Sequence, residues 1–305
     1  MRIAVLGAGA VGGYYGGRLA QSGQDVRFLY RSEYDAVVES GLRIESVDGN
    51  WHGPVAAFRS AAEIGPCDAV LVSFKSAQSG LFDELVPQVL APDGVVFCLM
   101  NGLGHEELLA EVVGPDRVAA GAAFICSERT APGTIQHTAA GGLALAPYFT
   151  EGRQRIREAC HDLRDRFLAA KVPCQAPEDG KAVKWGKLVW NIPFSGLSIF
   201  AGGVTTDRIV SDPVLRAFAM DLMRETLQAA KACGVDLDPS LPQRNMEQTE
   251  TMGAYRPSML VDFLLDRPLE WESIVAEPLR RGERAGATLP RMRELLAGIK
   301  SRVGG

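Results

Sequence analysis

The sequence predicts a chain of two domains: an α/β domain with a largely parallel sheet, then a domain of helices alone. Its 305 residues exceed the length of one ordinary domain. Patterns typical of strands and of helices alternate as far as Pro177, as in a doubly wound α/β fold. Only helical patterns follow Pro177, so we expect the domains to span residues 1–178 and 179–305.

In the first domain, short apolar runs are separated by turn signals and by helical patterns. Asp48, Gly49 and Asn50 form a turn between two short strands, and the apolar run from Cys67 to Phe74 is typical of a strand covered on both faces. We expect strands at residues 3–6, 25–30, 41–47, 51–58, 67–74, 95–99, 117–126, 134–138 and 143–146, and helices at 11–20, 78–90, 106–113 and 153–170.

The second domain is expected to contain six helices, at residues 179–200, 212–234, 241–252, 257–265, 272–286 and 289–302. The pair Asp212 and Pro213 is a strong helix start, because it places an N-cap before a proline at the first helical position. In the last helix, apolar residues that recur at helical spacing predict a core face, formed by Leu289, Met292, Leu296 and Ile299.

Composition and charge exclude several classes of protein. Apolar residues make up 47% and charged residues 23%, as in globular proteins, and a net charge of −5 offers no basic field for nucleic acid. No run of 18 apolar residues is present, so we expect no membrane span. The six cysteines form no C-x-x-C motif and no cluster with histidine, so we expect no metal site. With a strand at the very start in place of a signal peptide, reduced thiols and a cytoplasmic location are expected.

The segment between the first strand and the first helix carries the spacing G-x-G-x-x-G, in the residues Gly7, Ala8, Gly9, Ala10, Val11 and Gly12. In a dinucleotide site Gly7 permits the tight turn, Gly9 lets a pyrophosphate approach the backbone, and Gly12 lets the helix pack on the strand. A glycine-rich turn that serves packing alone is the alternative. The position between a strand and a helix favours a Rossmann-type dinucleotide-binding domain, with an all-α C-terminal domain behind it.

Three polar residues follow other predicted strands: Arg31, Lys75 and Asn101. Ligands of an open α/β sheet bind at the carboxyl ends of its strands, so we expect these residues around the cofactor. Arg31 stands where NAD-binding proteins usually carry an acid, and therefore favours NADP, although Glu33 is close by. A solvated surface charge at Arg31, and a turn at Asn101 with Gly102, are the alternatives.

In the second domain Lys187, Asn191 and Ser195 recur every four residues and so form one stripe on a helix. Taken alone, Lys187 could be one more lysine of a solvated basic face that Lys181 and Lys184 begin. Further along, Ser258 follows a proline, and Glu270 lies twelve positions later. Their ordinary interpretations are a helix N-cap and a solvated carboxylate.

Taken together, the glycine turn, Lys75, Asn101 with Gly102, the Lys187–Asn191 pair, and Ser258 with Glu270 resemble the ketopantoate reductase (2-dehydropantoate 2-reductase) family. The resemblance covers nearly the whole chain. It implies a Rossmann domain and a helical domain, and NADPH-dependent reduction of 2-dehydropantoate, a 2-oxo acid, to pantoate on the way to pantothenate and coenzyme A. A homodimer is compatible with it.

The resemblance also implies roles for single residues. Lys187 matches the general acid and Glu270 the acid of the site. Asn191 and Ser258 match substrate contacts, while Arg31 and Lys75 match cofactor contacts and Asn101 a residue near the nicotinamide. A second asparagine of the family, one turn after Asn191, is Ser195 in this chain, and we expect Ser195 to border the substrate. This departure leaves a different 2-oxo acid open as the substrate.

Three other functions fit the sequence less well. A short-chain dehydrogenase relies on Tyr-x-x-x-Lys, and no tyrosine of this chain has a lysine four residues later. A 6-phosphogluconate or glycerol-phosphate type of dehydrogenase shares the two-domain plan and a lysine–asparagine pair, but the spacing from Ser258 to Glu270 favours ketopantoate reductase. A non-catalytic NADP sensor would be favoured by loss of Lys187 or Glu270, and both are present.

Overall fold

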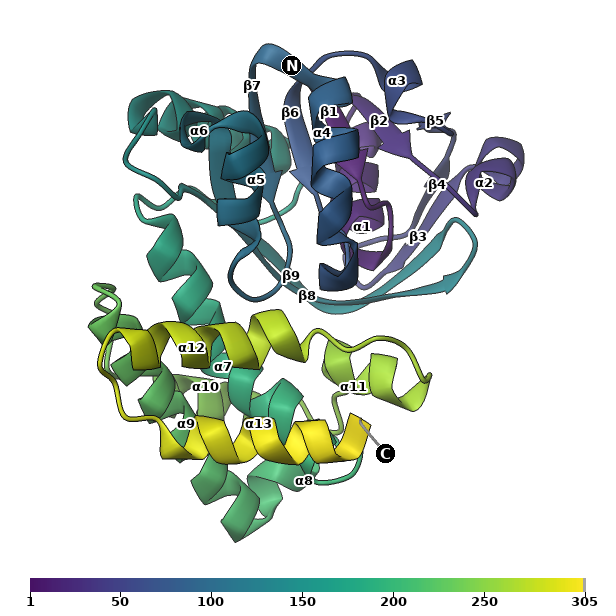
Figure 1. Cartoon of the computed structure of the whole chain (residues 1–305). Helices are drawn as coiled ribbons and strands as arrows, with labels where there is room; N and C mark the ends of the chain where they lie inside the picture. The colour runs from purple at the N-terminus through teal and green to yellow at the C-terminus, as the bar shows by residue number, and fades with distance from the viewer. Residues whose placement is uncertain (304–305) are drawn as a thin grey trace. The chain divides into compact units, whose positions relative to one another are not determined.

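The computed structural model describes residues 1–303, and packing divides the chain into two compact units. The first unit comprises Met1–Met100 and His105–Val183. The second comprises Asn101–Gly104 and the chain from Lys184 onward. By its contacts, a segment of four residues from the middle of the chain therefore belongs to the second unit, although both of its flanks belong to the first. Figure 1 shows the strands of the chain in the first unit and helices in both units.

The first unit is built on one mixed sheet of ten strands within the described residues. Its strands are β1 (Arg2–Leu6), β2 (Asp25–Leu29), β3 (Leu42–Ser46), β4 (Trp51–Gly53), β5 (Ala56–Phe58), β6 (Cys67–Val72), β7 (Leu90–Cys98), β8 (Val118–Ala131), β9 (Thr134–Pro147) and β10 (Cys174–Gln175). Their order is β4-β3-β9-β8-β7-β6-β1-β2-β5, and β10 pairs with β9. Neighbours from β8 to β5 are parallel, which confirms the Rossmann-type α/β prediction, whereas β8–β9 and β3–β4 are antiparallel.

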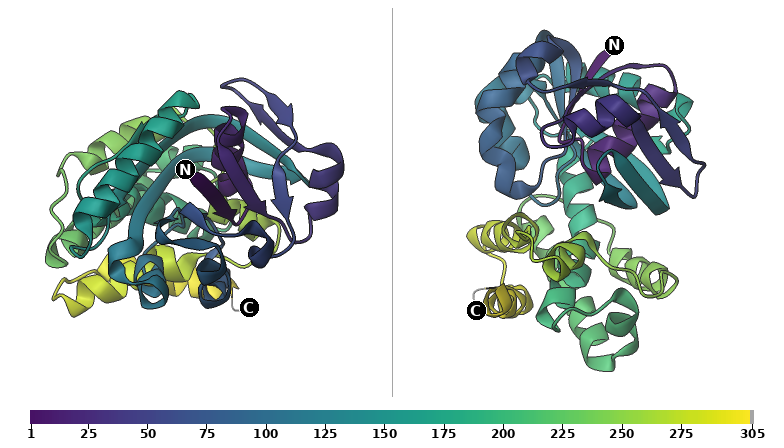
Figure 2. Two further views of the ribbon diagram at one scale, coloured as in Figure 1. Left: turned by 90° about the horizontal axis from the view of Figure 1, so that it is seen from above. Right: turned by 90° about the vertical axis from the view of Figure 1, so that its right-hand side faces the viewer.

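Helices cover both faces of this sheet (Figure 2). They are α1 (Ala10–Gln21), α2 (Tyr34–Ser40), α3 (Ala61–Ile64), α4 (Phe82–Val89), α5 (His105–Val113) and α6 (Arg153–Ala169), with 3-10 turns at Ser76–Leu81 and Pro115–Arg117. In β1, Ile3 and Val5 join one apolar core with α1 and α6, whereas Ala4 and Leu6 join a second core with α3, α4 and α5. This alternation explains why β1 is apolar at every position after Arg2.

Several predicted elements of the first unit were wrong in extent, and the prediction lacked α2, α3 and β10. Residues 51–58 form two strands, β4 and β5, at opposite ends of the sheet, because Pro54 has no N–H to continue a ladder. The predicted strands at 134–138 and 143–146 are one strand, β9, which is irregular at Ala140, where φ is +63°. The predicted helix at 78–90 begins as a 3-10 turn and ends at Val89, where β7 starts.

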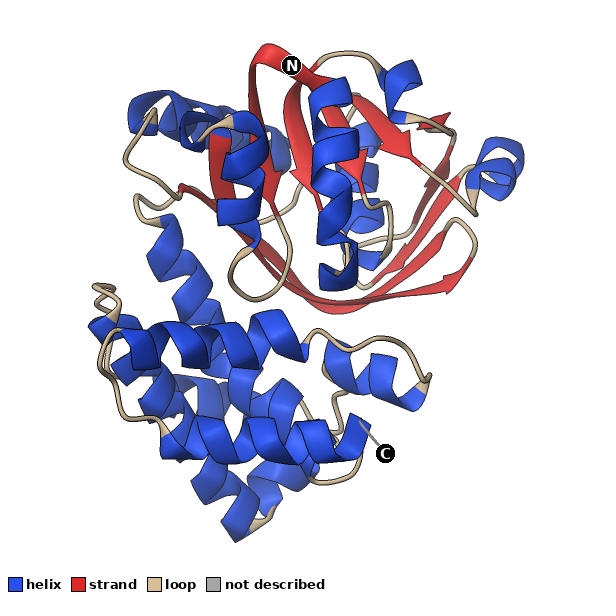
Figure 3. Ribbon diagram, viewed as in Figure 1, coloured by secondary structure: helices blue, strands red, loops and turns tan. Residues whose placement is uncertain are grey.

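The second unit consists of helices joined by loops in its described part (Figure 3). They are α7 (Gly180–Phe200), α8 (Thr206–Ser211), α9 (Pro213–Ala232), α10 (Leu241–Glu250), α11 (Ser258–Leu264), a π-helical turn at Glu272–Ala276, α12 (Glu277–Arg284) and α13 (Pro290–Val303). Asp212 caps α9 as predicted, since its carboxylate accepts from Val214 N at 2.8 Å and Leu215 N at 3.1 Å. The sequence prediction lacked α8.

The core face predicted for α13 is correct except at one position. Leu289, Met292 and Ile299 are buried, but the side chain between them in the core is Leu295, with Leu296 only partly buried. No helix in the described part of the chain is both long and apolar enough to span a membrane. All six cysteines are free thiols, five of them buried, and no group of metal-ligating side chains is found among the described residues.

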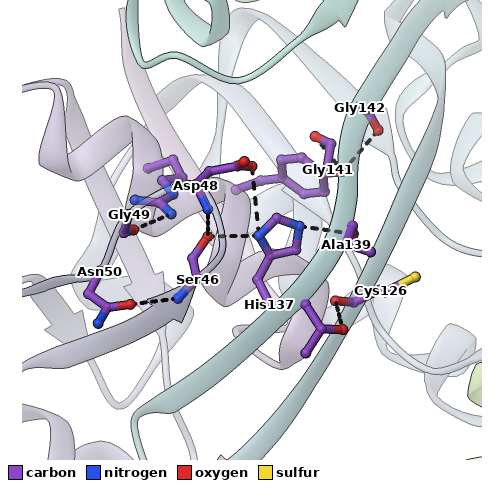
Figure 4. Close-up of polar contacts among 12 residues, drawn as sticks. Ser46, Asp48, Gly49, Asn50, Cys126, His137, Ala139, Gly141 and Gly142 are labelled. Atoms are coloured by element: carbon purple, nitrogen blue, oxygen red, sulfur yellow. Dashed lines mark hydrogen bonds and ion pairs between the residues drawn. The ribbon is translucent and has the colours of Figure 1, made fainter.

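A cluster of polar contacts around the buried His137 holds the turn between β3 and β4 against the sheet (Figure 4). His137 of β9 lies between the Ser46 hydroxyl, 2.8 Å from Nδ1, and the carbonyl of Ala139, 3.0 Å from Nε2. Because a carbonyl only accepts, Nε2 donates to it, and in the neutral imidazole Nδ1 accepts from the Ser46 hydroxyl. Arg18 of α1 donates to the carbonyl of Gly49 at 2.8 Å. The turn is thereby tied both to β9 and to α1.

Candidate functional site

The glycine turn of the first unit has the geometry of a phosphate site. Gly7 has φ +95°, and a Cβ there would lie 2.8 Å from the carbonyl carbon of Ser73, which follows β6. A Cβ at Gly12 would lie 2.4 Å from the carbonyl oxygen of Gly7. At Gly9, by contrast, no other described atom lies within 4 Å of a Cβ position. Packing thus requires Gly7 and Gly12, while the space beside Gly9 is open for a ligand.

The start of α1 fits an anion. Its N-cap is Gly9, which offers no side-chain hydrogen bond, and the first turn contains no acidic residue. The first N–H groups of the helix, on Ala10, Val11 and Gly12, therefore have no capping side chain. Together with the partial positive charge of a helix N-terminus, this is the arrangement that binds a pyrophosphate. The residues present fit a dinucleotide, and the packing-only interpretation does not explain the open space at Gly9.

Arg31 and Lys75 are exposed at the same edge of the sheet as this turn. Arg31 follows β2 and Lys75 follows β6, and these strands pair in parallel with β1 on its two sides. The carboxyl ends of the three strands lie together, so two cations flank the turn after β1. Ala8 is buried beside it.

Asn101, which we expected near the cofactor, belongs to the second unit and contacts Lys187. The Lys187 ammonium donates to Asn101 Oδ1 at 2.7 Å. An amide oxygen is a fixed acceptor for a lysine at this site, so it restricts the direction in which the flexible side chain points. The structure thus brings together two residues that stand 86 positions apart in the sequence.

The electrostatic environment of Lys187 favours loss of its proton. Burial lowers the pKa of Lys187 to about 7, the Lys184 ammonium acts in the same direction, and Glu270 acts against both. Lys184 is only 3% exposed, so the alternative interpretation of a solvated basic face does not hold for it, whereas Lys181 is exposed. Glu270 is also 3% exposed and is therefore no solvated carboxylate. A lysine with a pKa near neutrality can both give and take a proton at physiological pH.

Asn191 and Ser195 continue the Lys187 stripe along α7. Asn191 is 8% exposed and Ser195 2% exposed, and neither side chain has a hydrogen-bond partner among residues 1–303. Buried polar groups normally have such partners, so both fit contacts to a ligand. Ser258 is exposed at the first position of α11, where Pro257 is the N-cap, so the alternative interpretation of Ser258 as a helix N-cap does not hold.

The loop that carries Asn101 rests on the π-helical turn just after Glu270. The N–H of Leu103 donates to the carbonyl of Ser273 at 3.0 Å. Gly102 has φ +85°, and a Cβ there would lie 2.3 Å from the same carbonyl oxygen. The π-turn therefore fixes Asn101, and a π-turn at such a place is typical of functional sites. Ser273 was not predicted, because no motif marks it.

We expect Gly102→Ala to lower kcat by about 10- to 100-fold, because the displaced loop misdirects Asn101 and with it Lys187. The free energy of unfolding should fall by about 1–3 kcal/mol, since the new Cβ adds strain. Gly234→Ala is the matched control: Gly234 has φ +78° but open space around it. For both variants, steady-state kinetics measures kcat, and denaturant unfolding measures the free energy of unfolding. Equal turnover in both variants would show that the loop does not position Lys187.

Comparisons with known proteins decide the family. A model described as ketopantoate reductase PanE/ApbA matches residues 3–148, and the corresponding C-terminal model matches residues 179–302. The 2-dehydropantoate 2-reductase of Nostoc sp. (strain PCC 7120) is 37% identical over 306 residues, which cover 98% of this chain and 94% of that protein. The chain belongs to the ketopantoate reductase family.

Solved structures agree with this assignment over the whole length. The crystal structure of 2-dehydropantoate 2-reductase from Geobacter metallireducens GS-15 is 36% identical, with a TM-score of 0.93 and 99% of each chain covered. That of the Methylococcus capsulatus 2-dehydropantoate 2-reductase is 34% identical, with a TM-score of 0.88, covering 99% of this chain and 96% of that one. As a member of the ketopantoate reductase family, the chain has both parts of the fold that its sequence predicted.

Proposed function

We propose that the chain reduces 2-dehydropantoate to pantoate with NADPH, as a step toward pantothenate and coenzyme A. The observation that carries this proposal is the arrangement around Lys187: a lysine with a pKa of about 7, directed by Asn101 and influenced by the buried Glu270. Family membership and the names of relatives at 34–37% identity support the substrate.

The reduction of a ketone to an alcohol needs a hydride on carbon and a proton on oxygen. The bound cofactor supplies the hydride, with its two electrons. Negative charge then develops on the ketone oxygen, where the Lys187 ammonium stabilises it and donates the proton. Lys187 becomes neutral in this step and regains its proton from water, which a pKa near 7 permits. Asn101 orients the ammonium, and Glu270 favours its charged form.

The remaining polar groups would hold the substrate. Asn191 lies one helical turn from Lys187, and its amide can both donate and accept. Ser195, one turn further, offers a hydroxyl without a protein partner in the described chain, and so does Ser258 at the start of α11. On the cofactor side, the turn from Gly7 to Gly12 would hold the pyrophosphate, and Arg31 with Lys75 would hold the 2′-phosphate.

The test is the consumption of NADPH by purified protein, followed by the absorbance of the reduced nicotinamide, with a panel of 2-oxo acids. We expect 2-dehydropantoate to give the highest kcat/KM of the panel. If another 2-oxo acid of the panel gives a higher kcat/KM, that acid is the better candidate for the substrate. Oxidation of 6-phosphogluconate would identify the alternative type of dehydrogenase, and binding of NADPH with no turnover of any of these acids would identify a sensor.

Replacing Arg31 by Ala should weaken NADPH binding by about 10- to 100-fold, because a charge-assisted hydrogen bond to the 2′-phosphate is lost. NADH, which lacks that phosphate, should bind almost as before. Kd values from fluorescence titration of both cofactors check this. Equal kcat/KM of the unmodified enzyme with NADPH and NADH would contradict the assignment of Arg31.

Ser195→Asn should raise the preference for 2-dehydropantoate over its analogue without the terminal hydroxyl. Asparagine reaches further than serine and offers both donors and an acceptor, and a site that binds a hydroxyl rejects substrates that lack it. The kcat/KM ratio for the two acids, compared in both proteins, is the measurement. If the unmodified enzyme already rejects the analogue strongly, or the ratio does not move, Ser195 is a packing residue.

We also propose that the chain forms a homodimer and lies in the cytoplasm. Six free thiols without a disulfide support a reducing compartment. Light scattering on the purified protein tests self-association directly.

A further inference from the structure

Two acidic residues follow β2 close to Arg31, and each carboxylate is already paired with an arginine. Glu33 pairs with Arg129 of β8, and its second oxygen accepts from the N–H of Gly133 at 2.9 Å. Asp35 pairs with Arg59, the residue after β5. Arg31 itself makes no ion pair with any residue from 1 to 303. Of the charged side chains of Arg31, Glu33 and Asp35, only that of Arg31 has no oppositely charged partner among the described residues.

The ion pair of Glu33 with Arg129 limits how far this carboxylate can bind a ribose or repel a phosphate. An acid after the second strand of a dinucleotide fold normally accepts hydrogen bonds from the ribose hydroxyls and disfavours a 2′-phosphate. In this chain Glu33 is only 8% exposed, and both of its oxygens have protein donors. Its negative charge is neutralised by the Arg129 guanidinium, which is bound at one of those oxygens.

Both partners of Glu33 come from the tip of one hairpin. Arg129 stands near the end of β8, and Gly133 immediately precedes β9. The tip packs against α2, since a Cβ at Gly133, where φ is +65°, would lie 2.9 Å from the Val37 side chain. A change of Arg129 therefore alters the charge beside β2 without touching the glycine turn.

We propose that Arg129 sets cofactor selectivity by holding the Glu33 carboxylate in a paired, buried position, so that Arg31 meets the 2′-phosphate of NADP without a competing negative charge. This inference rests on the proposed use of NADPH. Arg129 is a positioning residue here: it acts through Glu33 and is not assigned to the cofactor itself. It also explains why an acid two positions after Arg31 does not make the site one for NAD.

Arg129→Met tests the inference by binding alone, with 2′,5′-ADP and 5′-AMP as probes in calorimetry. Removing the guanidinium leaves a carboxylate that repels a doubly charged phosphate, so affinity for 2′,5′-ADP should fall about five- to tenfold. Affinity for 5′-AMP should stay the same or rise, because the carboxylate becomes available to ribose hydroxyls. The double variant Arg129→Met with Glu33→Gln should recover the selectivity of the unmodified protein.

Arg2→Met is the matched control, because it removes an arginine from Asp25 at the opposite end of β2 and should leave the ratio of the two affinities unchanged. If the unmodified protein binds both probes equally, the proposed choice of NADPH fails and this inference with it. If the unmodified protein prefers 2′,5′-ADP but Arg129→Met keeps the full ratio, only the inference fails. A loss in Arg129→Met that Glu33→Gln does not repair would also overturn it, since the effect would then not pass through Glu33.

Discussion

Lys187→Ala should lower kcat by about 10²- to 10⁴-fold, the usual loss when a general acid is removed. NADPH should bind as before, because the glycine turn, Arg31 and Lys75 all belong to the first unit. Lys187→Arg should be nearly as slow, since a guanidinium keeps the charge but does not give up its proton. Steady-state kinetics with a fluorescence titration of NADPH measure both quantities.

Lys181→Ala is the control for this prediction, because Lys181 lies on the same helix but is exposed. It should leave kcat within about twofold of the unmodified enzyme, as expected for a solvated charge away from the site. Normal turnover by Lys187→Ala would show that the acid has been misassigned, and Lys184 would then be the next lysine to test.

Glu270→Gln should lower kcat/KM at neutral pH by about 10²-fold, a typical loss for one electrostatic contact at a reacting centre. Glu270 raises the pKa of Lys187 toward its charged form. Without the carboxylate this pKa falls below about 7, so less of the enzyme carries the proton that it must donate.

The pH profile gives the sign of the effect. The proposed mechanism needs protonated Lys187, so kcat/KM of the unmodified enzyme should decline as pH rises through about 7. Glu270→Gln should move this decline to lower pH. Lys184→Met should move it to higher pH, because a neighbouring ammonium that lowers the pKa of Lys187 is lost. Profiles recorded at saturating NADPH are the measurement, and shifts in the same direction for both variants would refute the electrostatic account.

Most of the fold could be predicted from local patterns, because helices with one apolar face follow from the spacing of apolar residues, and strands buried on both faces follow from continuous apolar runs. The runs at β1 and β6 and the cap of α9 are local features of this kind. Pairing between distant strands is not local. The separation of β4 from β5 to opposite ends of the sheet, and the continuity of β9 through Ala140, depend on partners elsewhere in the chain.

The same distinction holds for the site. The stripe of Lys187, Asn191 and Ser195 follows from helical spacing alone, and the structure keeps all three on α7. The contact of Asn101 with Lys187 and that of Glu33 with Arg129 span 86 and 96 positions, and no periodicity reports them. The burial of Lys184 does not follow from its position three residues before Lys187, because lysines are mostly exposed and its burial depends on the packing around α7.

Because Asn101–Gly104 belongs to the second unit, the proposed lysine site needs residues from both halves of the sequence. A fragment that starts at residue 179 would contain Lys187 and Glu270, yet it would lack the amide that directs the ammonium. Grafting this helical half onto another nucleotide-binding module would fail for the same reason, unless the host supplied an equivalent loop. Recombination between relatives should therefore keep this site intact only where the Asn101–Gly104 loop and the helices that contact it come from the same parent.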